Sequence, residues 1–169
     1  MKGHYSNILC VLSDTHRQDD VIAQAVHIAK SHQATLTIML SLESLPPNAN
    51  MVMESFSYID SQSSMETQAQ DWLRNQAEKW EEKYPTQTKV SIGSPLIDII
   101  TNVIKYQYDL VIKRAEESFL DRLFGSLDMR LLRKCPCPVW VLHQKCTSQY
   151  KNVVAALDLN YHYPKHEIS

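Results

Sequence analysis

Glycine is scarce in this chain. Only three of its 169 residues are glycine, namely Gly3, Gly93 and Gly125. Phosphate-binding loops use glycine because a residue without a Cβ atom lets backbone N–H groups come close to a phosphate. A loop with several glycines is therefore excluded, and any nucleotide site has to work with these three positions.

Net charge and long apolar runs are lacking as well. The chain has 17 Lys and Arg against 19 Asp and Glu, whereas proteins that bind nucleic acid through its phosphates carry excess basic charge. No apolar run approaches the roughly 20 residues of a membrane span, and the N-terminal stretch alternates like a strand rather than a signal peptide. The cysteines follow no secreted disulfide pattern. We therefore expect a cytoplasmic protein that binds neither nucleic acid nor a membrane.

Apolar spacing predicts strands that alternate with helices. The strands are expected at 7–12, 34–42, 88–92, 108–113 and 137–143, and the helices at 21–32, 64–84, 95–107 and 127–134. Residues 43–64 carry two prolines and many polar side chains, which favours a long surface loop. Asp19 or Asp20, Ser94 and Ser126 are the expected N-caps.

This alternation predicts the α/β fold class. Strands that are joined by helices form a parallel sheet covered on both faces. The chain is 44% hydrophobic, which is enough for such a core. We expect an open, doubly wound, Rossmann-like domain with a five-stranded sheet, and folds of this kind bind ligands at the carboxyl ends of their strands.

A short repeat indicates how the chain is divided. The stretch "YSNILCVLSD" at 5–14 aligns with "YKNVVAALDL" at 150–159, an offset of 145 residues. Repeats at the period of a domain indicate tandem domains, although ten residues can also agree by chance. We expect a complete domain at 1–146, and a linker with the first strand of a second domain at 147–169. The chain would then be a fragment of a two-domain protein.

Four stretches together resemble a known family. They are "ILCVLSD", the Ser94-Pro95 helix start, "YDLVIK" and "GSLDMRLLRKCPCPVWVL". In these stretches the sequence resembles the universal stress proteins, in which Gly-Ser opens the last helix and "PCPV" leads into the last strand. The tandem arrangement is most similar to the two-domain members. The resemblance implies a Rossmann-like fold and a role in the stress response.

The resemblance is weakest where members of the family bind ATP. Those members carry a Gly-x-x-Gly loop after the fourth strand and an aspartate at the end of the first. Here Arg114 stands where the loop would begin, no glycine follows before Gly125, and Ser13 replaces the aspartate, with Asp14 one residue on. Three acidic residues, Glu116, Glu117 and Asp121, would repel a triphosphate. We expect no cofactor, with ATP or AMP as the alternative.

The residues that remain include candidates for a residual nucleotide or anion site. Its candidates are Ser13, Asp14, Lys113, Arg114, Gly125, Ser126 and Leu127. Each has a simpler interpretation. Gly125 and Ser126 fit a helix cap, and Lys113 with Arg114 fits a basic pair in solvent at a strand end.

The other reactive residues predict neither a metal site nor catalysis. Cys135 and Cys137 are too few for zinc, which takes four ligands, and fit small buried apolar positions. Ser13, Asp14 and His16 are the residue types of a hydrolase triad, but no nucleophile elbow is present. Apolar residues in the expected loop suggest a pocket for another small ligand or a partner surface: Met51, Met53, Phe56 and Tyr58.

The last strand carries the expected partner surface. In the resembling family the final strand pairs antiparallel with its twin, either in a dimer or between the two domains of one chain. We therefore expect a homodimer, or pairing with a second domain, through Pro138, Val139, Trp140, Val141, Leu142 and His143. The expected function is a non-enzymatic stress-response module that acts by such pairing. The alternative is a nucleotide-binding switch with at most slow hydrolysis.

Overall fold

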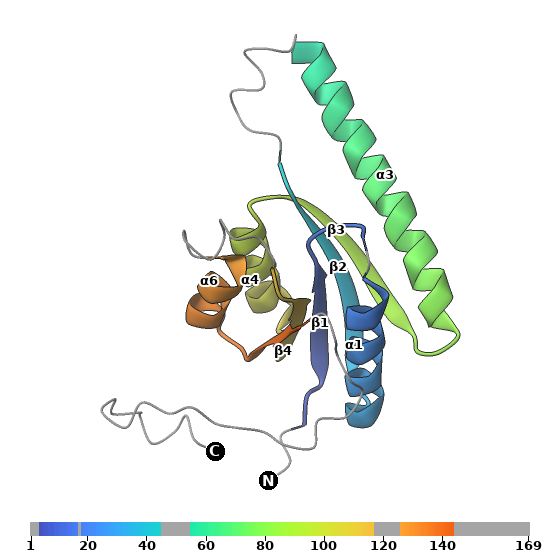
Figure 1. The fold of residues 1–169 in the computed structure, drawn as a ribbon, viewed down its shortest axis with the longest axis vertical. Helices are drawn as coiled ribbons and strands as arrows, with labels where there is room; N and C mark the ends of the chain where they lie inside the picture. Colours follow the sequence, from blue (N-terminus) through green and yellow to red (C-terminus); the bar gives the residue numbers. More distant parts are fainter. Residues whose placement is uncertain (1–3, 17, 45–54, 117–125, 144–169) are drawn as a thin grey trace.

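Five strands alternate with four helices along the part of the chain that the structure describes. The computed structural model describes residues 4–16, 18–44, 55–116 and 126–143, with only the backbone at 55–62. The elements in chain order are β1 (Asn7–Leu12), α1 (Asp19–His32), β2 (Thr35–Glu43), α3 (Ser55–Glu81), β3 (Thr86–Gly93), α4 (Pro95–Tyr106), β4 (Leu110–Arg114), α6 (Leu127–Lys134) and β5 (Val139–Leu142) (Figure 1). The predicted order is confirmed. The segment 147–169, expected to begin a second domain, lies outside the described residues.

The sheet is parallel throughout and has the order β3-β2-β1-β4-β5. The chain winds outward from β1 through β2 to β3, and then returns to the other side of β1 for β4 and β5. The winding direction therefore reverses between β1 and β4. Ligands of doubly wound sheets bind at the carboxyl ends of the strands that flank such a reversal, so this edge is the first place to look for a site.

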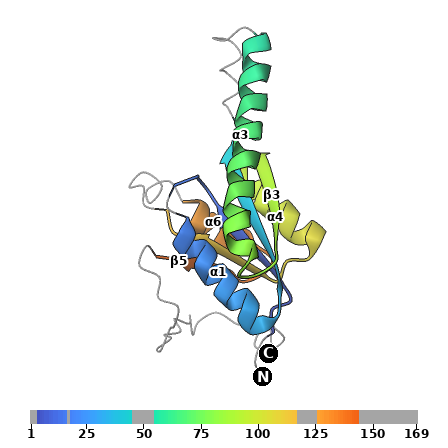
Figure 2. The same ribbon diagram turned by 90° about the vertical axis from the view of Figure 1, so that its right-hand side faces the viewer.

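Two helix layers cover the two faces of the sheet. Helices α1 and α3 lie on one face, and α4 and α6 lie on the other (Figures 1 and 2). Alternate residues of a strand point to opposite faces, so Ile112 of β4 packs toward α1 and α3, while Val111 packs toward α4 and α6. The same alternation sends the next two residues, Lys113 and Arg114, to opposite faces.

Helix α3 begins earlier than the sequence predicted. Residues 55–64 were expected in a loop, but they are helical. The reason is that neither proline nor glycine occurs between Pro47 and Pro85, so nothing interrupts the helix. The N-terminal half projects beyond the sheet (Figure 2), and the buried residues Ala69 and Leu73 lie in the other half. Phe56 and Tyr58 are therefore in this helix, although their side chains, like all of Met51 and Met53, lie outside the description.

The helix starts only partly follow the predicted caps. Asp19 and Asp20 lie in the first turn of α1, where the helix dipole favours acids, and Gln18 is the N-cap. Ser94 occupies the N-cap of α4, but its side chain makes no capping hydrogen bond. Ser126 is a true side-chain cap, because its Oγ accepts a hydrogen bond from Met129 N at 3.3 Å. None of the described helices is long and apolar enough to cross a membrane.

Candidate functional site

Most of the predicted site residues gather at the carboxyl ends of β1 and β4. Ser13 and Asp14 follow β1, Lys113 and Arg114 end β4, and Ser126 and Leu127 begin α6. Ser13 is exposed. The carboxylate of Asp14 binds residues that follow it closely in the chain, since its Oδ1 accepts hydrogen bonds from His16 N and Gln18 Nε2, both at 2.7 Å. Gly125 lies outside the described residues.

Lys113 is fully buried, so its expected place in solvent is wrong. Its Nζ contacts the carboxylate of Asp128 in the first turn of α6 and lies 3.6 Å from Oε1 of Glu116. An ammonium group without counter-charges is very unfavourable in a protein interior. The two carboxylates therefore make this burial possible. We call these three residues, Lys113, Glu116 and Asp128, the Lys113 cluster.

Arg114 reaches the other face of the sheet and is also paired. Its guanidinium group contacts the carboxylate of Asp20 in the first turn of α1, and its side chain is 18% exposed. Both cations at the end of β4 therefore meet acids from the first turn of a helix. The charge that a bound anion would seek is already balanced by the chain itself.

The N-terminus of α6 also has an internal acceptor. Leu127 N donates a hydrogen bond to Oε2 of Glu116 at 3.0 Å, and Glu116 N donates one to Oδ2 of Asp128 at 2.8 Å. First-turn N–H groups of a helix are the groups that bind phosphates and carboxylates in other proteins. Glu116 was expected as an unpaired, repelling charge; it is instead part of the structure. Glu117 and Asp121 lie outside the described residues.

Asp128 is the residue that sequence reasoning missed. The sequence held a signal for it, because Lys113 ends a buried strand and shares a face with buried Val111. A cation at such a position needs an acidic partner, and the next helix in the chain packs against that face. What the sequence lacked was the spacing: fifteen residues separate Lys113 from Asp128, and no short motif spans that distance.

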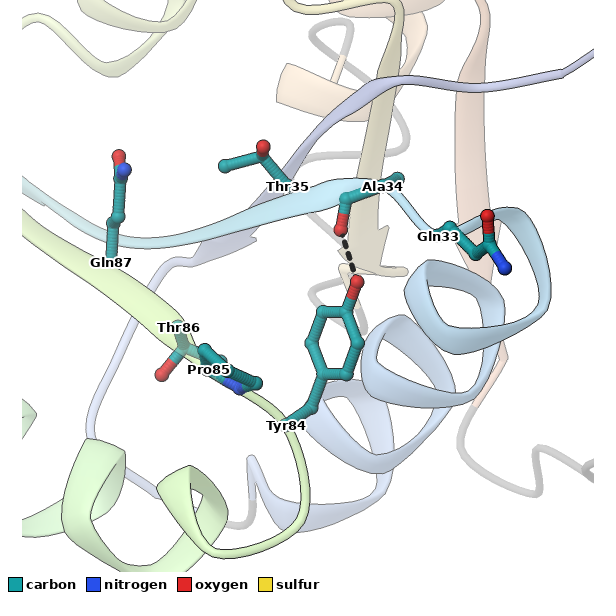
Figure 3. Close-up of a pocket in the computed structure, with 7 residues that line it drawn as sticks. All are labelled: Gln33, Ala34, Thr35, Tyr84, Pro85, Thr86 and Gln87. Atoms are coloured by element: carbon teal, nitrogen blue, oxygen red, sulfur yellow. Dashed lines mark hydrogen bonds between the residues drawn. The ribbon is translucent and has the colours of Figure 1, made fainter.

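A cavity of about 330 Å³ lies at the other end of the sheet (Figure 3). It is lined at the amino ends of β2 and β3 by Gln33, Ala34, Thr35, Tyr84, Pro85, Thr86 and Gln87. The Tyr84 ring points across toward β2, and its hydroxyl donates a hydrogen bond to the Ala34 carbonyl at 2.6 Å. None of these seven described residues is charged, so no ionised side chain among them would attract a phosphate.

The remaining reactive residues form no metal-binding group in the described ranges, and Asp14 and His16 do not make the contact of a catalytic pair. No group of three or more His, Cys, Asp and Glu that would hold a metal ion is found there. Cys135 and Cys137 differ from the expectation of small buried apolar residues, because both are half-buried and their sulfurs lie 3.7 Å apart. His16 meets Asp14 through its backbone N–H, which is not the contact of a catalytic histidine.

The strand order defines a doubly wound α/β domain, a kind of domain that binds ligands beside the reversal of the strand order. The Lys113 cluster lies at that reversal, at the end of β4. The sequence profile of the Universal stress protein family matches residues 4–143. This chain therefore belongs to the universal stress protein family, as its resemblance indicated.

Individual relatives refine this assignment. Universal stress protein E of Photorhabdus laumondii is 26% identical over 162 residues, which cover 94% of this chain and 52% of the relative. The chain thus spans about half the length of the curated relatives it matches, all of the E type. Among solved structures, universal stress protein UspA from Lactobacillus plantarum has a TM-score of 0.68 at 22% identity, covering 83% of this chain and 99% of its own. A universal stress protein in complex with cAMP has a TM-score of 0.61 at 16% identity, with coverage of 85% and 100%. These two likenesses concern the fold.

Proposed function

We propose that this domain is a non-enzymatic stress-response module of the cytoplasm that acts by pairing, either with a second domain of its kind or with a second copy, and that it does not bind ATP. The observation that carries the proposal is the Lys113 cluster. It places two carboxylates and one ammonium group where a phosphate would need positive charge. The half-length match to the E-type relatives supports a second domain as the natural partner.

Electrostatics argues against a phosphate beside this cluster. A phosphate at the N-terminus of α6 would have to displace Glu116 from Leu127 N, and would then face Asp128 and the displaced carboxylate. Two unit charges 4 Å apart repel by about 4 kcal/mol at an effective dielectric constant of 20. One ammonium group does not offset two such repulsions, since its own charge is already engaged by the carboxylates.

The edge strand β5 supports the pairing part of the proposal. It is the last strand in the order of the described sheet, and edge strands are the strands that add a further strand from another chain. The carbonyls of Pro138 and Leu142 face β4, because they accept hydrogen bonds from Val111 N and Ala115 N. The alternation of a parallel ladder therefore directs the N–H and C=O groups of Val141 to the outer edge. Helix α6, which contacts β5, also exposes the apolar side chains of Met129 and Leu132.

A nucleotide-binding switch is the second candidate function. The neighbour solved with cAMP favours it, as does the capped N-terminus of α6. In this candidate AMP or ATP would contact Ser126 and Leu127, and Glu116 would swing away.

Nucleotide content separates the two candidates. The protein is purified without added nucleotide and denatured, the released small molecules are identified by mass spectrometry, and ATP and AMP are titrated by calorimetry. We expect no nucleotide and no binding heat at millimolar ATP. The matched variant is Glu116→Gln, which keeps the side-chain shape and removes the charge; weak binding in this variant alone identifies Glu116 as the cause. Micromolar binding by the unaltered protein would favour the switch instead.

Pairing is tested by light scattering at tens of micromolar protein. We expect twice the 19.5 kDa mass of one chain. The variant Val141→Pro removes an outward N–H group and keeps the inner ladder, so it is expected to be monomeric with an unchanged circular dichroism spectrum. Val141→Thr keeps the N–H group and is expected to stay dimeric. A monomeric unaltered protein contradicts the homodimer and leaves pairing with a second domain.

A further inference from the structure

Two cysteines lie in sulfur contact at the turn between α6 and β5. The Sγ atoms of Cys135 and Cys137 are 3.7 Å apart, and both side chains pack against the core on the α4 and α6 face. The backbone bends at Pro136 and Cys137, which brings the side chains on either side of the bend together. A disulfide bond is about 2.05 Å long, so the sulfurs have less than two ångströms to close.

Both ends of this turn are fixed to regular structure. Cys135 is the C-cap of α6, and its backbone N–H donates a hydrogen bond to the Leu131 carbonyl at 2.8 Å. Pro138, after the second cysteine, accepts one from Val111 N in β4 at 3.0 Å. The sulfur contact is therefore a property of the fold and not of a free chain end, and the two sulfurs of the reduced pair are held within 2 Å of bonding distance.

The pair differs from the third described cysteine in its chemistry. Cys10 is fully buried in β1, and burial raises its pKa to about 12, which makes its thiol inert. In the pair, the hydrogen bond from Cys137 to the Cys135 thiolate lowers the pKa of Cys135 to about 7. The same contact raises the pKa of Cys137, because its proton is held between the two sulfurs. A half-buried thiolate near neutral pH is the form that attacks disulfides.

We propose that Cys135 and Cys137 form a thiol–disulfide exchange site, which closes to an intramolecular disulfide when it meets a small-molecule disulfide of the oxidised-glutathione class. In the first step the Cys135 thiolate attacks one sulfur of that molecule, so a mixed disulfide forms and one thiolate leaves. In the second step the Cys137 thiol loses its proton to solvent and attacks the Cys135 sulfur. The second glutathione thiolate then leaves. The protein loses two electrons and two protons, and the small disulfide is reduced to two thiols.

The order of the two steps follows from the shared proton. While Cys135 is a thiolate, Cys137 keeps its proton, so only Cys135 is ready to attack. After the mixed disulfide forms, Cys135 has no negative charge, and the contact that held the proton on Cys137 is lost. Cys137 is thereby released to complete the exchange. In a reducing cytoplasm such a disulfide is a transient, oxidant-dependent state. The inference is independent of the proposed function, since it involves neither the Lys113 cluster nor a pairing strand.

The test is a redox titration of the whole chain in buffers of reduced and oxidised glutathione, quenched with an alkylating reagent. Trypsin cleaves after Lys134 and Lys145, so both cysteines fall in one peptide, 135–145, without Cys10 or Cys146. We expect that peptide to lose two hydrogen atoms and both alkylation sites as the oxidised fraction rises, and to regain them in reduced glutathione. A peptide that stays fully alkylated, or that keeps one glutathione, overturns the proposal.

Two variants assign the roles. Cys137→Ala is expected to accumulate one stable glutathione on Cys135, because nothing resolves the mixed disulfide. Cys135→Ala is expected to react at least tenfold more slowly than the unaltered protein, because the remaining thiol is mostly protonated near neutral pH. A Cys135→Ala variant that reacts as fast as the unaltered protein would contradict the assignment. Circular dichroism of both variants verifies that the fold is retained.

A pH profile supplies a readout that packing does not move. In the unaltered protein, alkylation of Cys135 is expected to rise with pH through a midpoint near its pKa of about 7, since only the thiolate reacts. In Cys137→Ala the hydrogen-bond donor is gone, so the midpoint moves to higher pH. A midpoint that is the same in both proteins overturns the role of Cys137.

Discussion

The two ends of the parallel sheet differ in what they offer a ligand. The carboxyl end holds buried charge, with Lys113 and Arg114 each bound to an acid of the chain. The amino end holds open space, in a cavity whose described lining residues are all uncharged. An anionic ligand needs space and unmatched positive charge in one place, and the described residues supply this combination at neither end.

The difference in charge between the two ends of the sheet arises from the direction of the helices. The carboxyl end of the sheet receives the N-termini of α1 and α6, whose dipoles favour negative charge. The chain supplies that charge itself through Asp20, Asp128 and Glu116. At the other end α1 finishes with Lys30 and His32 in its last turn, where positive charge is favoured. Each end is thus complemented by side chains of this protein.

Breaking the charge pair at the carboxyl end has the largest expected effect. Asp128→Ala leaves the ammonium group of Lys113 buried, with only Glu116 nearby and Glu116 N without its acceptor. We expect the free energy of unfolding to fall by about 3–5 kcal/mol, as for other broken buried ion pairs. Urea denaturation at one fixed protein concentration measures it.

Two controls sharpen this prediction. Asp98→Ala removes a first-turn acid of α4, whose side chain accepts a hydrogen bond from the neutral Ser91 hydroxyl at 3.0 Å. The loss of stability is expected to be about 1.5 kcal/mol, the lower end for a hydrogen bond to a charged group. The double variant Lys113→Met with Asp128→Leu replaces the pair by apolar groups and is expected to regain most of the stability. A loss for Asp128→Ala no larger than that for Asp98→Ala contradicts the structural role of the cluster.

The sequence predicted the architecture because strands and helices repeat a local pattern. Burial on both faces is visible in "NILCVL", and Ser126 stands directly before an amphipathic stretch. Loop and helix were harder to separate at 55–64, since polar residues without proline or glycine fit either state. The prolines at 46 and 47 favoured a loop, and the prediction extended that loop past Ser55, where the helix begins.

The candidate site was less predictable because its contacts are not local. The chain places Lys113 and Asp128 in one buried contact across a connection that no short motif describes. The alternation of side chains along a strand already places Lys113 on a covered face of the sheet. The interpretation of Lys113 as solvent-exposed rested instead on its position at the end of the predicted strand. Proximity in the sequence did reveal the two cysteines, although their sulfur contact depends on the bend at Pro136.

At the amino end the expected effect is smaller, because only the hydrogen bonds of one neutral hydroxyl are involved. Tyr84→Phe removes the hydroxyl that donates to the Ala34 carbonyl at 2.6 Å and keeps the ring. We expect a loss of about 1 kcal/mol in the free energy of unfolding. Tyr106→Phe is the matched control, since that residue is 43% exposed, and a change within about 0.5 kcal/mol is expected. Equal losses in the free energy of unfolding would mean that the hydrogen bond of the Tyr84 hydroxyl does not stabilise the amino end of β2.

The smallest expected effect concerns the helix cap beside the Lys113 cluster. Ser126→Ala removes an Oγ that accepts from Met129 N at 3.3 Å, so a loss of about 0.5–1 kcal/mol is expected. Ser94→Ala changes the same residue type at the N-cap of α4, where the side chain makes no capping hydrogen bond, and is expected to cost less. Thermal and urea unfolding measure both. A different outcome is that Ser126→Ala changes stability no more than Ser94→Ala but alters a calorimetric ATP signal. Ser126 would then be a ligand contact, and the charge at this end of the sheet would not be fully matched by the chain.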